Sequence, residues 1–136
     1  MATWIGTGIG SFSTWPVWVI VILVVVLIIF LTEMTSNTAS TAAFLPILAS
    51  VAIGLGENPL LLAIPTAMGA SCAFMLPVAT PPNAIVYGSD KITIPQMSKA
   101  GLWLNFLFIG LISLAALTVI SWFFGIEIGV LPEWAQ

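Results

Sequence analysis

A polar stretch inside an apolar run limits what this chain can fold into. Residues 31–46 read LTEMTSNTASTAAFLP, and hydroxyl, amide and carboxyl side chains fill the first half of this stretch. A backbone with such side chains is tolerated at membrane depth only where it is buried in protein or lines a wet cavity. The stretch therefore predicts a binding site and not an ordinary membrane-spanning helix.

The composition of the chain predicts a membrane location. Hydrophobic residues make up 60% of the sequence and charged residues 5%, with 2 basic residues, 5 acidic residues and no histidine. Soluble domains carry about 25% charged residues. We therefore expect an all-α integral membrane chain in contact with the lipid bilayer, and no nucleic-acid partner, because a basic patch is missing.

The residue types also argue against an enzyme. Cys72 is the single cysteine, and the chain has no histidine to activate its thiol. No two carboxylates lie close in sequence as an acid and base pair would. We expect no catalytic residues, and we interpret Cys72 as a small packing residue.

Two short apolar limbs flank the polar stretch, at residues 16–31 and 39–53. Pro16 suits the first turn of a helix. Each limb is shorter than the roughly 20 residues that span a bilayer. We interpret residues 16–53 as a re-entrant helical hairpin with a polar tip, and one tilted, broken span is the alternative.

A third apolar segment is interrupted by prolines. We expect it to be helical over residues 60–78. Pro81 and Pro82 cannot continue that helix, but they suit the first turn of a new helix that Thr80 caps. Residues 60–87 are therefore predicted to form one broken transmembrane helix.

The two lysines predict the orientation of the chain. Lys91 and Lys99 lie within residues 88–100, which by the positive-inside tendency form a cytoplasmic loop. We expect the plasma (inner) membrane, with the C-terminus outside. The other assignments are a loop or the end of a preceding helix at 1–15, an external turn at 54–59, an intact transmembrane helix at 101–124 and an external tail at 125–136.

The two breaks bring helix ends of opposite polarity to membrane depth. Carbonyl groups of residues 32–35 and near Ala79, with the side-chain oxygens of Thr32 and Asn37, suit a small cation. Amides of residues 38–40, and those after Thr80 and Pro81, suit a carboxylate or another oxyanion.

No basic side chain is expected at membrane depth, so dipoles, a co-bound cation or residues outside this chain must balance a bound anion. An anion that travels with sodium meets this need. Glu33 has three open interpretations: it is protonated, it pairs with a segment outside this chain, or it belongs to a cation site.

Residues 31–46, together with ATPPNAIVYG at 79–88, resemble the divalent anion/sodium symporters, the sodium-coupled carriers of dicarboxylates, citrate and sulfate. Members of that family carry two inverted repeats, each with a Ser-Asn-Thr hairpin tip beside a broken helix. From about Pro16 onward the chain resembles the C-terminal part of the second repeat.

The resemblance implies a set of site residues. The substrate anion would contact Ser36, Asn37, Thr38, Thr80 and Pro81. A co-transported sodium ion would be surrounded by Thr32, Thr35, Asn37 and Ala79, with Thr35 and Ala79 offering mainly backbone oxygens.

The resemblance also implies an elevator movement. Residues 16–86 would belong to the moving part, residues 102–124 would be peripheral, and the complete protein would be a homodimer that includes the remaining N-terminal part of the transporter.

We therefore interpret the chain as the C-terminal portion of a sodium-coupled di- or tricarboxylate, or sulfate, symporter that works by alternating access. The alternative within the family is an exchanger or a proton-coupled relative. The alternative from another class is a small non-transporting membrane subunit or a truncated product.

Overall fold

The computed structural model describes residues 15–135, and every regular element in this range is helical. The elements are α2 (Val17–Thr32), α3 (Asn37–Gly54), α4 (Leu60–Gly69), α5 (Pro81–Tyr87), α6 (Ile94–Ala115), a π-helical turn η1 (Ala116–Ile120), α7 (Ser121–Phe123) and a 3₁₀ turn η2 (Glu133–Ala135). The prediction of an all-helical fold is confirmed. Except for Trp15, the predicted loop or helix end at residues 1–15 lies outside the described residues.

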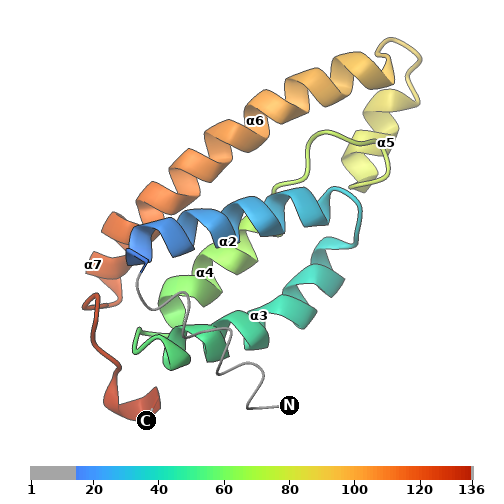
Figure 1. Cartoon of the computed structure of the whole chain (residues 1–136). Coiled ribbons are helices and arrows are strands. Elements are labelled where there is room, and N and C mark those ends of the chain that lie inside the picture. The colour runs from blue at the N-terminus through green and yellow to red at the C-terminus, as the bar shows by residue number, and fades with distance from the viewer. Residues whose placement is uncertain (1–14, 136) are drawn as a thin grey trace.

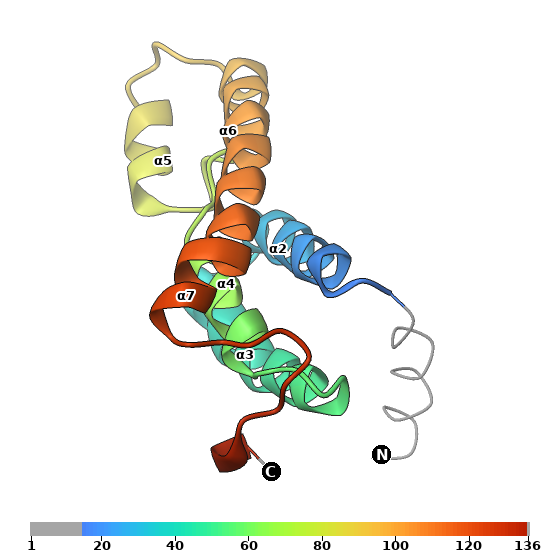
Figure 2. The same ribbon diagram turned by 90° about the vertical axis from the view of Figure 1, so that its left-hand side faces the viewer.

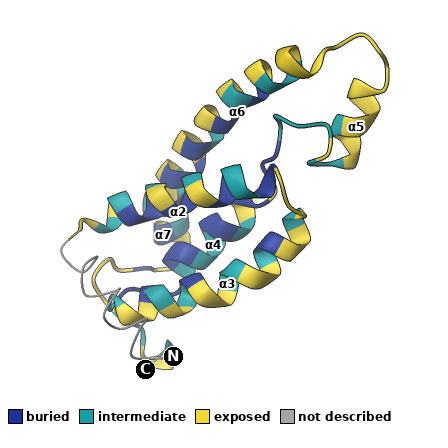
Figure 3. Ribbon diagram, turned by 45° about the vertical axis from the view of Figure 1, so that its right-hand side comes forward, coloured by how far each residue is buried: buried dark blue, intermediate teal, exposed yellow. Residues whose placement is uncertain are grey.

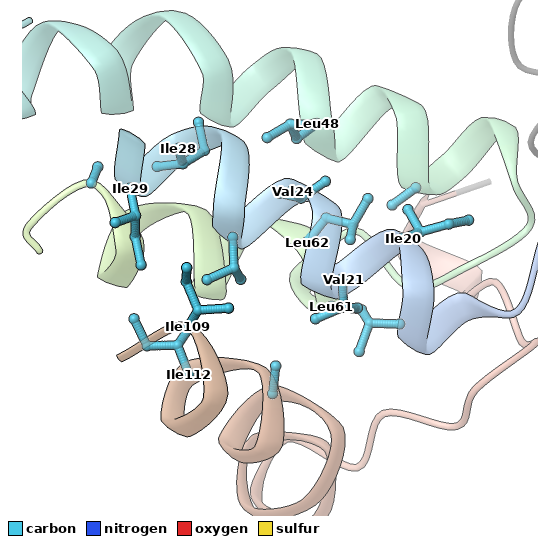
Figure 4. Packing of buried hydrophobic residues seen from close by; sticks show 14 of the residues in the cluster. Ile20, Val21, Val24, Ile28, Ile29, Leu48, Leu61, Leu62, Ile109 and Ile112 are labelled. Atoms are coloured by element: carbon cyan, nitrogen blue, oxygen red, sulfur yellow. The ribbon is translucent and has the colours of Figure 1, made fainter. Parts of the chain in front are cut away.

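Helix α2 lies at the centre of the fold, in contact with α3, α4 and α6 (Figure 1). Its sequence is apolar on all sides, which is typical of a helix surrounded by other helices. Apolar residues of α2, α3, α4 and α6 meet in one cluster (Figure 4). The buried positions of α2 are Ile20, Val21, Val24, Val25, Ile28, Ile29 and Thr32.

The outer faces of the helices carry many large apolar side chains. Exposed residues cover the outward sides of α3 and α6 (Figure 3). Trp103 and Leu114 of α6 and Trp122 of α7 are among the exposed large apolar residues. Two helices, Asn37–Gly54 and Ile94–Phe123, are long and apolar enough to cross a membrane. These features support the predicted integral membrane location.

Two helix boundaries differ from the predicted ones. Helix α4 ends at Gly69 instead of continuing to residue 78, and residues 70–80 form an irregular linker. Helix α6 begins at Ile94, inside the predicted loop 88–100, because the Thr93 N–H donates to Gln96 Oε1 at 2.9 Å in a capping box.

The last helix contains a π-helical turn that the sequence did not predict. Ser121 Oγ, directly after the turn at Ala116–Ile120, donates to the carbonyl of Ala116 at 2.7 Å. The side chain of Ser121 therefore bonds to a backbone acceptor where a regular α-helix was expected.

The far end of the α3–α4 pair contacts the C-terminal segment. Glu57 is 5% exposed and accepts one hydrogen bond, at 2.8 Å, from the N–H of Gly129. Gly129 has a φ of +85°, which suits glycine. This hydrogen bond links the segment after α7 to the turn between α3 and α4.

Candidate ligand site at two helix breaks

The two interruptions predicted from the sequence lie side by side in the structure. The turn from α2 into α3 lies beside the start of α5 (Figure 1), and the two segments line one cavity of about 500 Å³. We call this the tip cavity. Its lining residues are Met34, Thr35, Ser36, Asn37, Thr38, Val78, Ala79, Thr80 and Pro81.

All the residues predicted to contact the substrate line the tip cavity, as do Thr35 and Ala79 from the predicted sodium site. Thr32 is fully buried behind the tip. The structure therefore gathers the predicted residues in one region, in two adjoining groups.

The hairpin tip offers free hydrogen-bond donors to the cavity. The N–H groups of Asn37 and Thr38 have no acceptor within the described part of the chain, and Ala39 N–H reaches Ser36 Oγ only at 3.5 Å. These groups form the positive end of the 18-residue helix α3. An oxyanion is the ligand that such an end favours.

The start of α5 contributes less than predicted. Pro81 and Pro82 have no N–H, and the Asn83 N–H is bonded to Thr80 Oγ1 at 3.4 Å. The prediction that amides after Thr80 and Pro81 receive an oxyanion therefore fails for Pro81 and Pro82, and it stays a prediction for the Asn83 N–H, whose hydrogen bond is nearly as long as that of Ala39. The hydroxyl hydrogen of Thr80 is one donor that this side can give to a ligand.

Three oxygen atoms meet behind the tip. Thr32 Oγ1 lies 2.7 Å from Asn37 Oδ1 and 2.9 Å from the carbonyl oxygen of Ala70. The Thr32 hydroxyl has one hydrogen but two acceptor oxygens within hydrogen-bond distance. The three oxygens therefore suit a bound cation, or the Asn37 amide is rotated so that its Nδ2 donates to Thr32 Oγ1. Sequence reasoning missed Ala70, because residues 60–78 were expected to be continuous helix.

Glu33 has a role that none of its three interpretations anticipated. The side chain is 3% exposed. Its Oε1 accepts hydrogen bonds from the N–H of Phe74 at 2.8 Å, from the N–H of Met75 at 3.0 Å and from Asn105 Nδ2 at 2.8 Å. Its Oε2 accepts from the N–H of Met75 at 3.0 Å and of Leu76 at 3.3 Å.

The carbonyl groups of the same linker are bonded to other side chains. Asn83 Nδ2 donates to the carbonyls of Ala73 and Leu76, each at 3.0 Å. Ser98 Oγ donates to the carbonyl of Met75 at 3.2 Å. The linker is stable without helical hydrogen bonds because these side chains replace them.

Glu33 and Asn105 are the structural residues of the site that sequence reasoning did not place. The signal for Glu33 was a carboxylate in an apolar chain with no basic residue nearby. The signal for Asn105 was a single amide within an apolar span. Neither signal identifies a partner that lies 72 positions away.

A cavity lined by neutral polar groups at two broken helices, within an apolar helical bundle, is typical of membrane proteins that bind solutes and ions at membrane depth. The chain matches the family of the sodium:sulfate symporter transmembrane region over residues 1–126, and it belongs to that family. The resemblance predicted from the two motifs is confirmed at the family level.

Curated relatives include the sodium-dependent dicarboxylate transporter SdcS of three Staphylococcus aureus strains, USA300, NCTC 8325 / PS 47 and COL. Each is 50% identical to this chain over 84 residues, which cover 62% of this chain and 16% of the relative. The chain therefore spans a small part of the length of these transporters.

Proposed function

We propose that this chain is the C-terminal portion of a sodium-coupled symporter for a di- or tricarboxylate, or for sulfate. The tip cavity carries the proposal, because it joins free helix-end donors to a neighbouring group of oxygens. Membership of the sodium:sulfate symporter family supports it. The name of the relatives, sodium-dependent dicarboxylate transporter, favours a dicarboxylate among these anions.

The anion binds at the tip cavity. The free N–H groups of Asn37 and Thr38 and the hydroxyl groups of Ser36, Thr38 and Thr80 donate to its oxygens, and Pro81 forms part of the wall. The residues that line the cavity include no basic side chain. The positive end of α3 and a co-bound cation therefore balance the charge of the anion.

Sodium binds behind the tip, among Thr32 Oγ1, Asn37 Oδ1 and the Ala70 carbonyl. Thr35 and Ala79 stay in the proposed site as backbone ligands from the adjoining wall. Asn37 belongs to both groups, so sodium that holds its Oδ1 leaves its Nδ2 free to donate to the anion. Each ion then orients Asn37 for the other, which couples the two binding events.

Alternating access moves the site across the membrane. The 16 residues of α2 reach about 24 Å at 1.5 Å per residue, less than a hydrocarbon core of about 30 Å, which favours a re-entrant hairpin for residues 16–53. The broken helix at 60–87 moves with this hairpin. Because α6 packs against α2 and α4, we extend the moving unit to α6.

The remaining proposals concern the complete protein. It is a homodimer in the plasma (inner) membrane and includes an N-terminal part that completes the substrate site. Residues 54–59 and the C-terminus lie outside. The loop before α6, with Lys91, and the start of α6, with Lys99, lie in the cytoplasm.

The test is uptake of labelled succinate, citrate or sulfate by the complete carrier in proteoliposomes. We expect uptake of at least one anion with external sodium and background uptake when choline replaces sodium. Asn37→Ala should reduce uptake to background while membrane insertion is unchanged. Asn58→Ala is the matched control, because Asn58 caps the start of α4 through the Leu60 N–H, away from the cavity.

Each other outcome points to a stated alternative. Uptake that continues in choline indicates an exchanger or a proton-coupled carrier. No uptake of any of the three anions by the unmodified protein favours a non-transporting subunit. Normal uptake by Asn37→Ala contradicts the site.

A further inference from the structure

We infer that Glu33 is a positioning residue whose carboxylate sets the separation between the two walls of the tip cavity. Glu33 does not line the cavity, but the first wall begins at the next residue, Met34. The carboxylate also holds the N–H groups of Phe74 to Leu76, just before the second wall begins at Val78. One side chain therefore connects both walls.

The chemistry around Glu33 suits a carboxylate and no other side chain of its size. Four N–H donors point at its two oxygens, from three linker amides and from Asn105. A carboxylate accepts at both oxygens, whereas a glutamine at this position would point its NH₂ group at some of these N–H donors. Burial makes such a donor-to-donor contact costly.

Helix α6 completes the arrangement. Asn105 is fully buried, and its Nδ2 donates to Glu33. One turn earlier, Gly101 lies so close to the linker that a Cβ there would be 2.4 Å from the carbonyl oxygen of Phe74. The linker is thus held between Glu33 and one face of α6, which limits its movement relative to the hairpin tip.

The consequence concerns affinity. Because the Glu33 carboxylate holds the two cavity walls at a fixed separation, its loss should weaken binding of both ions without removing a ligand. This consequence rests on the proposed function. The separation of the walls does not depend on the proposed function, so a separate experiment measures it.

The first experiment measures the distance between the walls. Met34 and Val78 are 81% and 82% exposed and lie on opposite walls, so Met34→Cys and Val78→Cys accept spin labels, with Cys72→Ala to remove the native thiol. Double electron–electron resonance on the protein in lipid nanodiscs should give one narrow distance distribution. Glu33→Gln should broaden that distribution to at least twice its width.

Glu57→Gln is the matched control. Glu57 is also a buried glutamate, but it accepts one hydrogen bond, from Gly129, which the oxygen of glutamine can still accept. We expect its distance distribution to equal that of the unmodified protein. An unchanged distribution in Glu33→Gln, or equal broadening in Glu57→Gln, would overturn the inference.

The second experiment measures sodium and anion dependence of uptake in the complete carrier. Glu33→Gln should raise both half-saturating concentrations at least tenfold, and Glu57→Gln should leave them unchanged. Normal half-saturation in Glu33→Gln despite a broadened distribution would also overturn the inference. If the unmodified carrier transports nothing, the proposed function fails while the distance measurement still decides the role of Glu33.

A second variant, which keeps the negative charge, tests the inference if Glu33→Gln does not fold. Glu33→Asp retains both acceptor oxygens but is shorter by one methylene. Its distance distribution should stay narrow with a shifted centre, and its half-saturating concentrations should rise less than tenfold. A distribution with the original centre and width would contradict the positioning role.

Discussion

The two helix breaks that form the tip cavity are stabilised in different ways. The break between α2 and α3 is a short turn that is held largely by its neighbours in sequence: Thr35 Oγ1 donates to the Leu31 carbonyl at 2.9 Å, and Ser36 Oγ accepts from Ala39. The break between α4 and α5 is the long linker at 70–80, held by Glu33, Asn83 and Ser98.

This difference indicates that the short turn binds the ligand and that the linker supports the cavity. The short turn keeps its N–H groups at Asn37 and Thr38 free, so it can give them to a ligand. The linker uses its N–H groups at Phe74 to Leu76 internally, so these three amides support the second wall and do not donate to a ligand. Variants of the linker should therefore lower stability, and variants of the turn should lower uptake.

The largest effect is expected where the linker touches α6. In Gly101→Ala the new Cβ would lie 2.4 Å from the carbonyl oxygen of Phe74 and 2.5 Å from its carbon, so the linker must move. We expect a destabilisation of about 3 kcal/mol and loss of uptake. Thermal unfolding in detergent measures the first effect and proteoliposome uptake the second.

Gly110→Ala is the control on the same helix. No atom lies within 4 Å of a Cβ at Gly110, so alanine should be neutral or should stabilise α6 by up to about 1 kcal/mol. Equal unfolding temperatures for the two variants would show that the linker is not held against α6.

A smaller effect is expected for Asn83→Ala, which removes the donor to the Ala73 and Leu76 carbonyls. The Leu76 carbonyl keeps the Ala79 N–H as a donor at 3.2 Å, but the Ala73 carbonyl loses its side-chain donor, so the substitution should cost about 1–3 kcal/mol. Asn83→Asp keeps the shape but turns carboxylate oxygens toward the same carbonyls, so its unfolding temperature should be lower still. A more stable Asn83→Asp would mean that these hydrogen bonds do not hold the linker.

The smallest effect on stability is expected for Ser36→Ala in the short turn. The capping hydrogen bond is long, at 3.5 Å, and exposed, so its loss should cost about 0.5 kcal/mol. Because Ser36 lines the tip cavity, the half-saturating anion concentration should nevertheless rise severalfold.

Ser50→Ala, within α3, is the matched control for Ser36→Ala at the N-cap of that helix. Ser50 Oγ is exposed, donates to the Pro46 carbonyl and lies away from the cavity, so uptake should be unchanged. If Ser36→Ala alters uptake no more than Ser50→Ala, the turn is not the binding element and the comparison of the two breaks fails.

Local patterns predicted much of this site from the sequence. The polar stretch at 31–46 and the prolines after Thr80 placed both breaks, because capping and proline effects act within a few residues. The sequence pattern did not predict the early end of α4, because residues 70–78 are apolar enough for a helix and their one proline, Pro77, lies near the end of this segment. Their helical hydrogen bonds are replaced by groups from elsewhere in the chain.

By itself, the sequence determined an all-helical membrane chain of the sodium:sulfate symporter family, with a polar tip and a second break. Composition and local backbone chemistry are sufficient for the helices, the tip and the second break, and the motifs at 31–46 and 79–88 carry the resemblance to the family. Only the tertiary structure decided that Glu33 binds the linker and α6, through hydrogen bonds between residues 41 to 72 positions apart. A carboxylate buried among apolar helices needs donors, and the non-helical linker needs acceptors, so folding brings the two together.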